Sequence, residues 1–172
     1  QNPNYHKLLI ISDIAVIPAP DLKQKQAMIG YVANTARALG VEKPKVAMIT
    51  ATEQMLPGMP ACVEAAMLAK MSDRGQIAGC VVDGPLALDV ALCKEAAEIK
   101  KLKSEVAGDA DCCVFPSIEA ANVFYKLAGH FCPGVKMAAM VAGAKAPCVL
   151  SSRADSTETK LNSIALAALT AK

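Results

Sequence analysis

The chain has 172 residues, of which 53% are hydrophobic, 3% are aromatic and 20% are charged, with a formal net charge of +2. So small a net charge argues against a nucleic-acid-binding protein. We also expect neither a membrane-spanning helix, which needs ~20 consecutive apolar residues, nor a secretory signal. A core of Ala, Val, Ile, Leu and Met with so few aromatic residues is typical of stacked helices and buried parallel strands. The length suits one domain, or one domain plus a segment that completes another.

Seven cysteines are spread along the sequence, and most lie inside apolar runs: Cys62, Cys80, Cys93, Cys112, Cys113, Cys132 and Cys148. Their number is odd and no C-x-x-C occurs, so the spacing favours neither a disulfide framework nor a zinc site. We interpret them as buried, reduced thiols of a cytoplasmic protein.

Apolar runs and amphipathic segments alternate along the whole chain. Asp21 is the expected N-cap of the first helix, and Gly40 and Gly129 are expected to end the first and fourth helices. The expected strands are 8–16, 45–50, 77–82, 111–115, 137–141 and 147–150, and the expected helices are 22–39, 61–71, 86–101, 118–128 and 156 to the end. This order predicts an α/β fold of three layers, an open, mostly parallel sheet with helices on both faces.

Polar residues follow several of these strands, in the stretches 50–53, 83–85, 116–122 and 151–155. Right-handed crossovers would bring the carboxyl ends of the strands to one edge of the sheet. We therefore expect these stretches to converge at that edge, where α/β proteins bind ligands.

The stretch 151–156 is the most informative part of the sequence. It follows an apolar strand, precedes a helix and brings together serine hydroxyls, the guanidinium of Arg153 and the carboxylate of Asp155. Arg binds phosphate or carboxylate through a fixed fork of donors, and Ser adds a neutral donor. A plain helix cap is the alternative, with Asp155 or Ser156 as N-cap and Glu158 as a first-turn acid. The two interpretations are compatible.

Two further groups of polar residues invite a functional and a structural interpretation. Asp83 and Asp89 could present two carboxylates at a strand-to-helix junction, although a turn with Pro85 at the first helical position is favoured. Asn122 and Lys126 share one helix face, where Lys126 could hold a phosphate or simply be solvated.

Several common signatures are missing from the sequence. It contains no G-x-G-x-x-G, no G-x-x-x-x-G-K-[ST] and no G-x-S-x-G. The usual dinucleotide, P-loop and serine-hydrolase interpretations therefore lose their support. Its two histidines, His6 and His130, are too far apart in sequence to predict a metal site.

Taken in order, the motifs of the chain resemble those of the phosphate acetyl/butyryltransferase family, and its butyryl branch most closely. Each motif is weak alone, but the ordered set is specific and covers nearly the whole chain. The matching stretches are 12–16, 44–48, 50–53, 59–60, 70–75, 82–89, 116–122, 125–126, 143–144, 152–156 and 160–165.

The resemblance implies an enzyme that moves a short-chain, butyryl-type acyl group between coenzyme A and inorganic phosphate. Its substrates would be acyl-CoA, phosphate and acyl phosphate, with no organic cofactor, no metal and no covalent acyl-enzyme. The family has two α/β domains of the isocitrate/isopropylmalate dehydrogenase-like type, with the active site between them. Residues 1–135 would be the second domain and 136–172 a segment completing the first, whose N-terminal part is absent here. A homo-oligomer is expected.

The resemblance also implies roles for individual residues. Ser152 and Arg153 match the Ser-Arg pair beside the reacting thioester and phosphate. Lys126 matches the lysine implicated at the phosphate end of CoA, and we add Asn122 and Asp83 to this binding set.

The general base is left open by the comparison of motifs. Counted without gaps, Thr159 occupies the place of the catalytic Asp in the acetyl branch. Asp155 and Glu158 are therefore the rival bases, and we prefer Asp155 because it lies closer to the end of the strand.

Two other functions stay open. One is a metal- and NAD-dependent dehydrogenase of the same broad fold, for which Asp83 and Asp89 would be the candidate metal ligands. The other is an inactive fragment that binds CoA.

Overall fold

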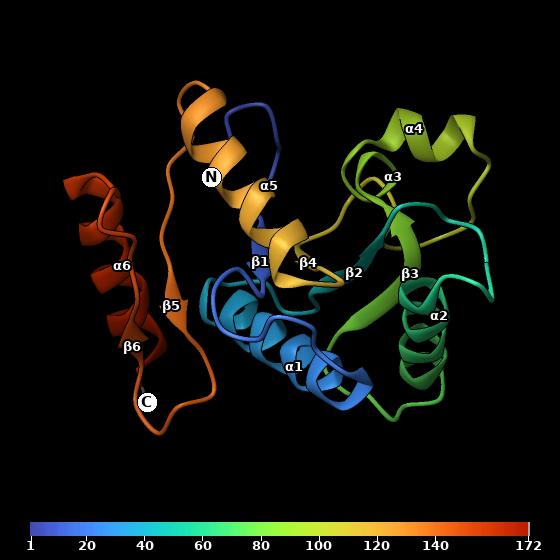
Figure 1. Ribbon diagram of the computed structural model, residues 1–172. Helices are drawn as coiled ribbons and strands as arrows, with labels where there is room; N and C mark the ends of the chain where they lie inside the picture. The colour runs from blue at the N-terminus through green and yellow to red at the C-terminus, as the bar shows by residue number, and fades with distance from the viewer. Residues whose placement is uncertain (172) are drawn as a thin grey trace. The chain divides into compact units, whose positions relative to one another are not determined.

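The structure is a computed structural model that describes residues 1–171 (Figure 1). The chain forms two compact units, a larger one over Leu9–Tyr125 and a smaller one made of Gln1–Leu8 and the residues from Lys126 onward. The assignment of 1–135 and 136–172 to two domains stays a prediction. Within the described residues, no helix combines the length and apolarity that crossing a bilayer requires.

The larger unit contains a four-stranded sheet in the order β1-β4-β2-β3, and every neighbouring pair is parallel. The strands are β1 (Ile10–Ser12), β2 (Lys45–Thr50), β3 (Val81–Ala87) and β4 (Cys112–Val114). The helices are α1 (Leu22–Ala38), α2 (Pro60–Asp73), α3 (Leu88–Leu92), α4 (Lys94–Ile99) and α5 (Ile118–Phe131), which continues into the smaller unit.

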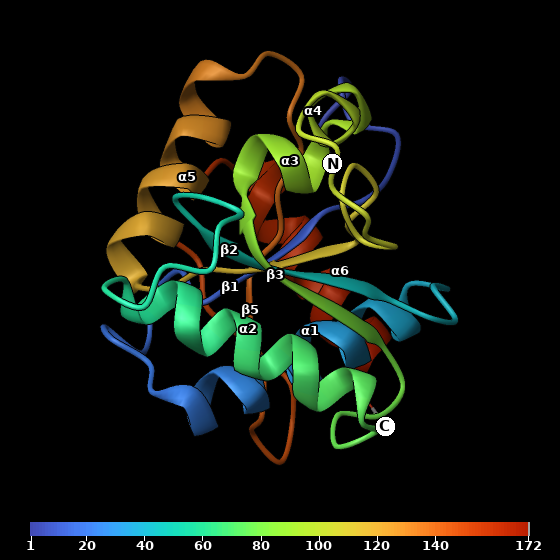
Figure 2. The same cartoon turned by 90° about the vertical axis from the view of Figure 1, so that its right-hand side faces the viewer.

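Alternate residues of β2 enter separate apolar clusters, because successive side chains of a strand point to opposite faces. Val46 and Met48 pack with residues of α1 and α2. Ala47 and Ile49 pack with residues of α3, α4 and α5. The two sets of helices accordingly lie on opposite sides of the sheet (Figure 2). The predicted α/β class and parallel sheet are confirmed, and helices cover both faces as expected.

Local signals placed the first helix and the second strand correctly. Asp21 caps α1 by accepting a hydrogen bond from the N–H of Gln24 at 2.7 Å, and the Gln24 side chain accepts in return from the Asp21 N–H at 2.9 Å. This is the reciprocal capping box. Strand β2 spans the predicted residues 45–50.

The strand predicted at 77–82 is wrong in position, because β3 runs through Val81–Ala87 and contains the supposed turn 83–85. Asp83 pairs with Ala47 inside the ladder and does not follow the strand. Gly84 serves close packing: an added Cβ would lie 2.7 Å from the Met48 Cβ and 3.2 Å from the Ala65 Cβ. Pro85 is buried in β3, so it does not begin a helix.

Three more expectations of secondary structure need correction. The strand predicted over 8–16 ends at Ser12, where the chain turns around the Asp13 carboxylate. The helix predicted at 86–101 is interrupted at Cys93, which has an extended backbone between α3 and α4. Gly129 does not end its helix but lies within α5.

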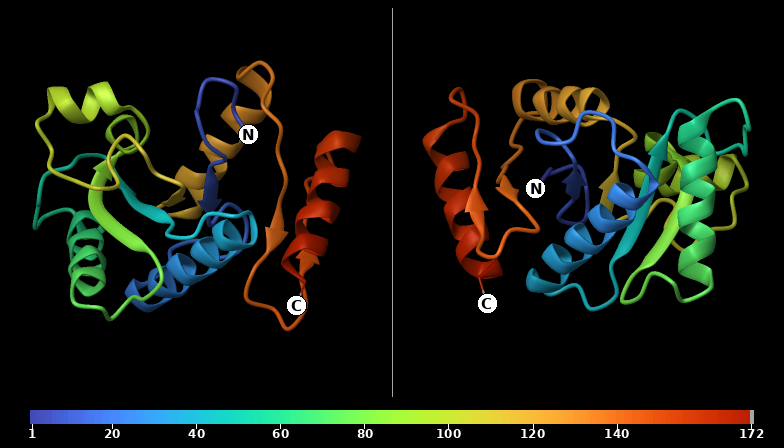
Figure 3. Two further views of the ribbon diagram at one scale, coloured as in Figure 1. Left: turned by 180° about the vertical axis from the view of Figure 1, so that it is seen from behind. Right: turned by 60° about the horizontal axis from the view of Figure 1, so that its bottom comes forward.

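The smaller unit contains an antiparallel pair, β5 (Met140–Val141) and β6 (Cys148–Val149), followed by α6 (Thr157–Thr170) (Figure 3). Small or polar side chains form the buried face of α6, namely Thr159, Ser163 and Ala167. Large apolar side chains face outward, with Leu161 64%, Ile164 57% and Leu169 56% exposed. The apolar pattern of this helix is therefore inverted relative to that of an ordinary core helix.

All seven cysteines are free in the structure. The expectation that they are buried is wrong for Cys93 and Cys148, which are exposed, and Cys80 and Cys132 are partly so. Cys93 lies at the break between two short helices, and Cys148 lies in a two-residue strand. Neither position is covered by a sheet or helix face.

Candidate functional site

The residues after β6 form a closed turn that carries Ser152, Arg153 and Asp155. The backbone N–H of Ser152 donates to Oδ2 of Asp155 at 2.7 Å, and the Asp155 N–H donates to the Ser152 carbonyl at 3.1 Å. Ala154 N–H donates to the Ser152 Oγ at 3.4 Å. Residues 152–155, which belong to the most informative stretch of the sequence, thus form a single hydrogen-bonded turn.

The helix cap that follows is a separate device from this turn. Ser156 is the N-cap of α6, since its Oγ accepts a hydrogen bond from the N–H of Thr159 at 3.1 Å. Ser156 Oγ also donates to the Thr159 Oγ1 at 3.1 Å. Of the two caps considered from the sequence, Ser156 is the one formed, which leaves Asp155 to the turn.

Glu158, the other candidate base, forms a surface ion pair. Its carboxylate lies 3.1 Å from the Lys136 Nζ, and the two side chains are 60% and 62% exposed. A pair this exposed is screened by water and salt, so it does little to fix the carboxylate.

Arg153 lies at the tip of the turn with its side chain exposed to solvent. Over residues 1–171, none of its donors is taken by an internal acid. An arginine with five N–H donors and no internal acid is suited to bind an anion from solution.

The segment that enters β5 is fastened to α6 by two side chains. The Ser163 hydroxyl, in a fully buried residue, donates to the Thr159 carbonyl at 2.7 Å and accepts from the Ala139 N–H at 2.9 Å. Nδ2 of Asn162 donates to the Met137 carbonyl at 3.4 Å. Sequence reasoning assigned these two residues no role of their own, although a serine and an asparagine inside an apolar helix are a detectable signal.

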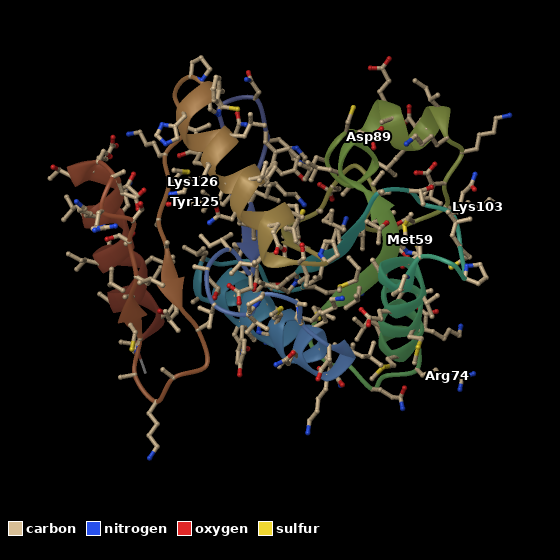
Figure 4. The ribbon with its side chains drawn as sticks, in the orientation of Figure 1. Met59, Arg74, Asp89, Lys103, Tyr125 and Lys126 are labelled. Atoms are coloured by element: carbon tan, nitrogen blue, oxygen red, sulfur yellow. The ribbon has the colours of Figure 1, made fainter. Side chains whose placement is uncertain are left out.

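Lys126 lies on α5 beside Tyr125 (Figure 4) and is partly buried. It belongs to the same compact unit as the turn, whereas Asn122 and Asp83 belong to the larger unit. The six predicted site residues are therefore divided between the two units.

Asn122 fastens the loop after β1 to α5. Its Nδ2 donates to the Ile14 carbonyl at 2.9 Å, across 108 residues of sequence. The same loop is organised by Asp13, whose carboxylate accepts hydrogen bonds from the N–H groups of Ala15, Val16 and Ile17 at 2.9, 3.1 and 2.7 Å. The Asn122 amide thus has a structural partner in addition to any role toward a ligand.

The carboxylates of Asp83 and Asp89 have separate local partners. Oδ1 of Asp83 accepts the Gly84 N–H at 2.8 Å. Asp89 lies 3.1 Å from the Lys100 Nζ, which is also 3.3 Å from Glu53, and the hydrogen bond from Lys100 lowers the pKa of Asp89. Within residues 1–171, no group of three or more His, Cys, Asp or Glu could hold a metal ion. Asp83 and Asp89 are therefore not part of such a group.

Comparison with known proteins identifies the family. The model of the phosphate acetyl/butaryl transferase family matches residues 3–168. The chain belongs to this family. It is 51% identical to a phosphate butyryltransferase of Clostridium acetobutylicum over 171 residues, which is 99% of this chain and 56% of the relative. It is 50% identical to a phosphate acetyltransferase of Thermotoga maritima, over 97% of this chain and 56% of the relative.

Solved structures agree with this assignment. A branched-chain phosphotransacylase from Enterococcus faecalis V583 superposes with a TM-score of 0.84 at 34% identity, over 93% of this chain and 57% of that one. A phosphotransacetylase from Staphylococcus aureus has a TM-score of 0.80 at 27% identity, over 97% of this chain and 51% of that one. The family expected from the motifs is confirmed. The chain spans about half the length of the curated relatives it matches.

Proposed function

We propose that the protein represented by this chain transfers a short-chain acyl group of the butyryl type between coenzyme A and inorganic phosphate. The family assignment supports this reaction class. The observation that carries the proposal onto particular residues is the turn closed by Asp155, which holds Ser152 and is followed at once by the solvent-exposed Arg153. Acyl-CoA, phosphate and acyl phosphate are then the substrates and products, and the reaction needs no organic cofactor or metal.

In the direction that forms acyl-CoA, a base takes the proton of the CoA thiol, since a free thiol with a pKa of ~8.5 is a poor nucleophile. The sulfur then attacks the carbonyl carbon of the acyl phosphate, a C–S bond forms, and the C–O bond to phosphate breaks. Ser152 donates a hydrogen bond to the carbonyl oxygen as negative charge grows there. Arg153 holds the phosphate through its fork of donors. Sequence comparison leaves Asp155 and Glu158 as the candidate bases.

The remaining candidates serve substrate binding in this proposal. Lys126 is a point charge for the phosphate end of CoA. Asn122 would contact the substrate through its Oδ1, because its Nδ2 donates to Ile14. Asp83 would contribute through Oδ2, because its Oδ1 accepts from Gly84.

We further propose that residues 1–135 form the second α/β domain of an isocitrate/isopropylmalate dehydrogenase-like protein and that 136–172 help to complete its first domain. The outward apolar face of α6 supports this, since Leu161, Ile164 and Leu169 are exposed in this chain and form a surface suited to another layer. A cytoplasmic homo-oligomer is the setting we propose for the enzyme.

The test is the phosphate-dependent loss of thioester absorbance from butyryl-CoA. It is run on this chain and on a form that covers the full length of its relatives, with acetyl-CoA and branched acyl-CoAs as further substrates. Activity in the longer form supports the transferase, and activity confined to it indicates that the site needs both halves. No turnover with any of these substrates in either form would contradict the proposal.

Two substitutions test whether residues of the turn take part in the reaction. Removing a donor to a developing oxyanion typically costs about 3–4 kcal/mol of barrier, or ~10²–10³-fold in rate. Ser152→Ala should lose about this much, and Arg153→Ala should lose more because it removes a charge as well as hydrogen bonds. Near-normal turnover of Arg153→Ala would refute the assignment of this residue.

A further inference from the structure

The carboxylate of Asp155 closes a ring around the tip of the turn. Ser152 and Asp155 are joined twice, by the Ser152 N–H to Oδ2 at 2.7 Å and by the Asp155 N–H to the Ser152 carbonyl at 3.1 Å. The first bond is short and has an ionised acceptor, which makes it the stronger type of hydrogen bond. Asp155 is partly buried, so solvent competes less for this contact than at a fully exposed site.

The closed ring determines where the two proposed functional groups lie. Arg153 and Ala154 are the two residues enclosed between the joined ends. Ser152 Oγ accepts the Ala154 N–H at 3.4 Å, so the hydroxyl oxygen is engaged and the hydroxyl proton is directed away from that donor. Asp155 thereby sets the backbone from which both the hydroxyl and the guanidinium project.

A positioning role conflicts with the use of Asp155 as the general base. Taking a proton would neutralise the carboxylate and weaken its bond to the Ser152 N–H. The turn would then loosen at the step in which Ser152 must donate to the oxyanion. A group that stays ionised throughout the reaction avoids this conflict.

We propose that Asp155 is a positioning residue, whose carboxylate holds the turn of Ser152 and Arg153 in place without accepting the proton of the CoA thiol. The catalytic part of this inference rests on the proposed function. It also departs from the preference for Asp155 as the base that the sequence suggested.

Asp155→Asn and Asp155→Ala separate the two roles. Asparagine keeps the shape and offers an amide oxygen to the Ser152 N–H, but it cannot act as a base, and alanine removes the acceptor. In a form that covers the full length of the relatives, a positioning role predicts that Asp155→Asn stays within about 10-fold of wild-type kcat while Asp155→Ala falls by ~10²-fold. Asp73→Asn, on an exposed ion pair of α2, controls for the loss of one negative charge.

A second readout does not depend on activity. In the 172-residue chain, hydrogen exchange of the Ser152 amide followed by NMR reports the turn directly. We expect this amide to exchange at least about 10-fold faster in Asp155→Ala than in wild type, with Asp155→Asn in between. The Ala139 amide, held by Ser163, should be unchanged in both variants and serves as the internal reference.

The outcomes are distinct. If Asp155→Asn is as inactive as Asp155→Ala while its Ser152 amide remains protected, Asp155 is the base and the inference is overturned. If Asp155→Ala leaves the exchange of the Ser152 amide unchanged, the carboxylate does not hold the turn and the inference is also overturned. If the wild-type protein transfers no acyl group, the proposed function fails, and the amide measurement still decides whether Asp155 organises the turn.

Discussion

Gly84→Ala should destabilise the larger unit because β3 passes too close to its neighbours to admit a methyl group. An added Cβ would lie 2.7 Å from the Met48 Cβ, 3.0 Å from the Met48 carbonyl oxygen and 3.2 Å from the Ala65 Cβ. Carbon atoms in contact normally sit about 3.5–4.0 Å apart, so the first contact is short by roughly 0.8 Å or more. The obstructing atoms are backbone or bonded directly to it, so rotating a side chain does not relieve the clash.

Relief requires β2 to move, and β2 is an interior strand that pairs with both β3 and β4. We expect a loss of about 3 kcal/mol in the free energy of unfolding, at the upper end of what overpacked cores show. Urea or guanidinium unfolding followed by circular dichroism measures this, with an unchanged slope indicating the same unfolded state.

Gly30→Ala is the matched control, because it makes the same chemical change on α1 with no atom beyond the local backbone of the helix within 4 Å of the added methyl. Alanine should stabilise this helix by about 0.5–1 kcal/mol relative to glycine. The two substitutions are therefore expected to act in opposite directions. A Gly84→Ala protein within about 0.5 kcal/mol of wild type, an effect typical of surface substitutions, would refute the packing described for β3.

Two further expectations concern ionisable groups. The hydrogen bond from Lys100 lowers the pKa of Asp89, so this contact stabilises the fold above the ordinary pKa of an aspartate and is lost as the pH falls through the lowered value. Lys100→Gln should raise the pKa of Asp89 in an NMR titration, and an unchanged pKa would contradict the pairing. Burial raises the pKa of Cys113 to about 12, so iodoacetamide at pH 8 should label the exposed Cys93 and Cys148 but spare Cys113 until the chain unfolds. Rapid labelling of Cys113 in the native chain, read by mass spectrometry, would contradict its burial.

The parts of the fold that local patterns specify were predicted well. The cap at Asp21 and the apolar run at 45–50 act over a few residues, and both were located correctly. The prediction of a turn at 83–85 is wrong because Asp, Gly and Pro are common in turns, whereas here Gly84 allows β3 to pack closely against Met48 of β2 and Ala65 of α2. Such a contact between distant segments has no local signature.

In the candidate site, too, local features could be predicted from the sequence and contacts between distant segments could not. The motif at 152–156 marked the turn and the start of α6, since strand ends and helix caps are local features. The bond from Asn122 to Ile14 and the bond from Ala139 to Ser163 join residues 108 and 24 positions apart. Neither could be read from spacing along a helix, because each depends on how separate segments pack.

The inverted face of α6 has a consequence for the order in which the protein becomes organised. Thr159, Ser163 and Ala167 bury little apolar surface against β5 and β6, so this helix gains less from the hydrophobic effect than α1, which buries Met28 and Ile29. In this chain α6 should open before the parallel sheet does and exchange its amides by local fluctuation. Since the Ser152 turn leads directly into α6, a surface that covers the outward face of the helix would add to the hold that Asp155 already gives this turn. Assembly would then also steady the residues that we propose for catalysis.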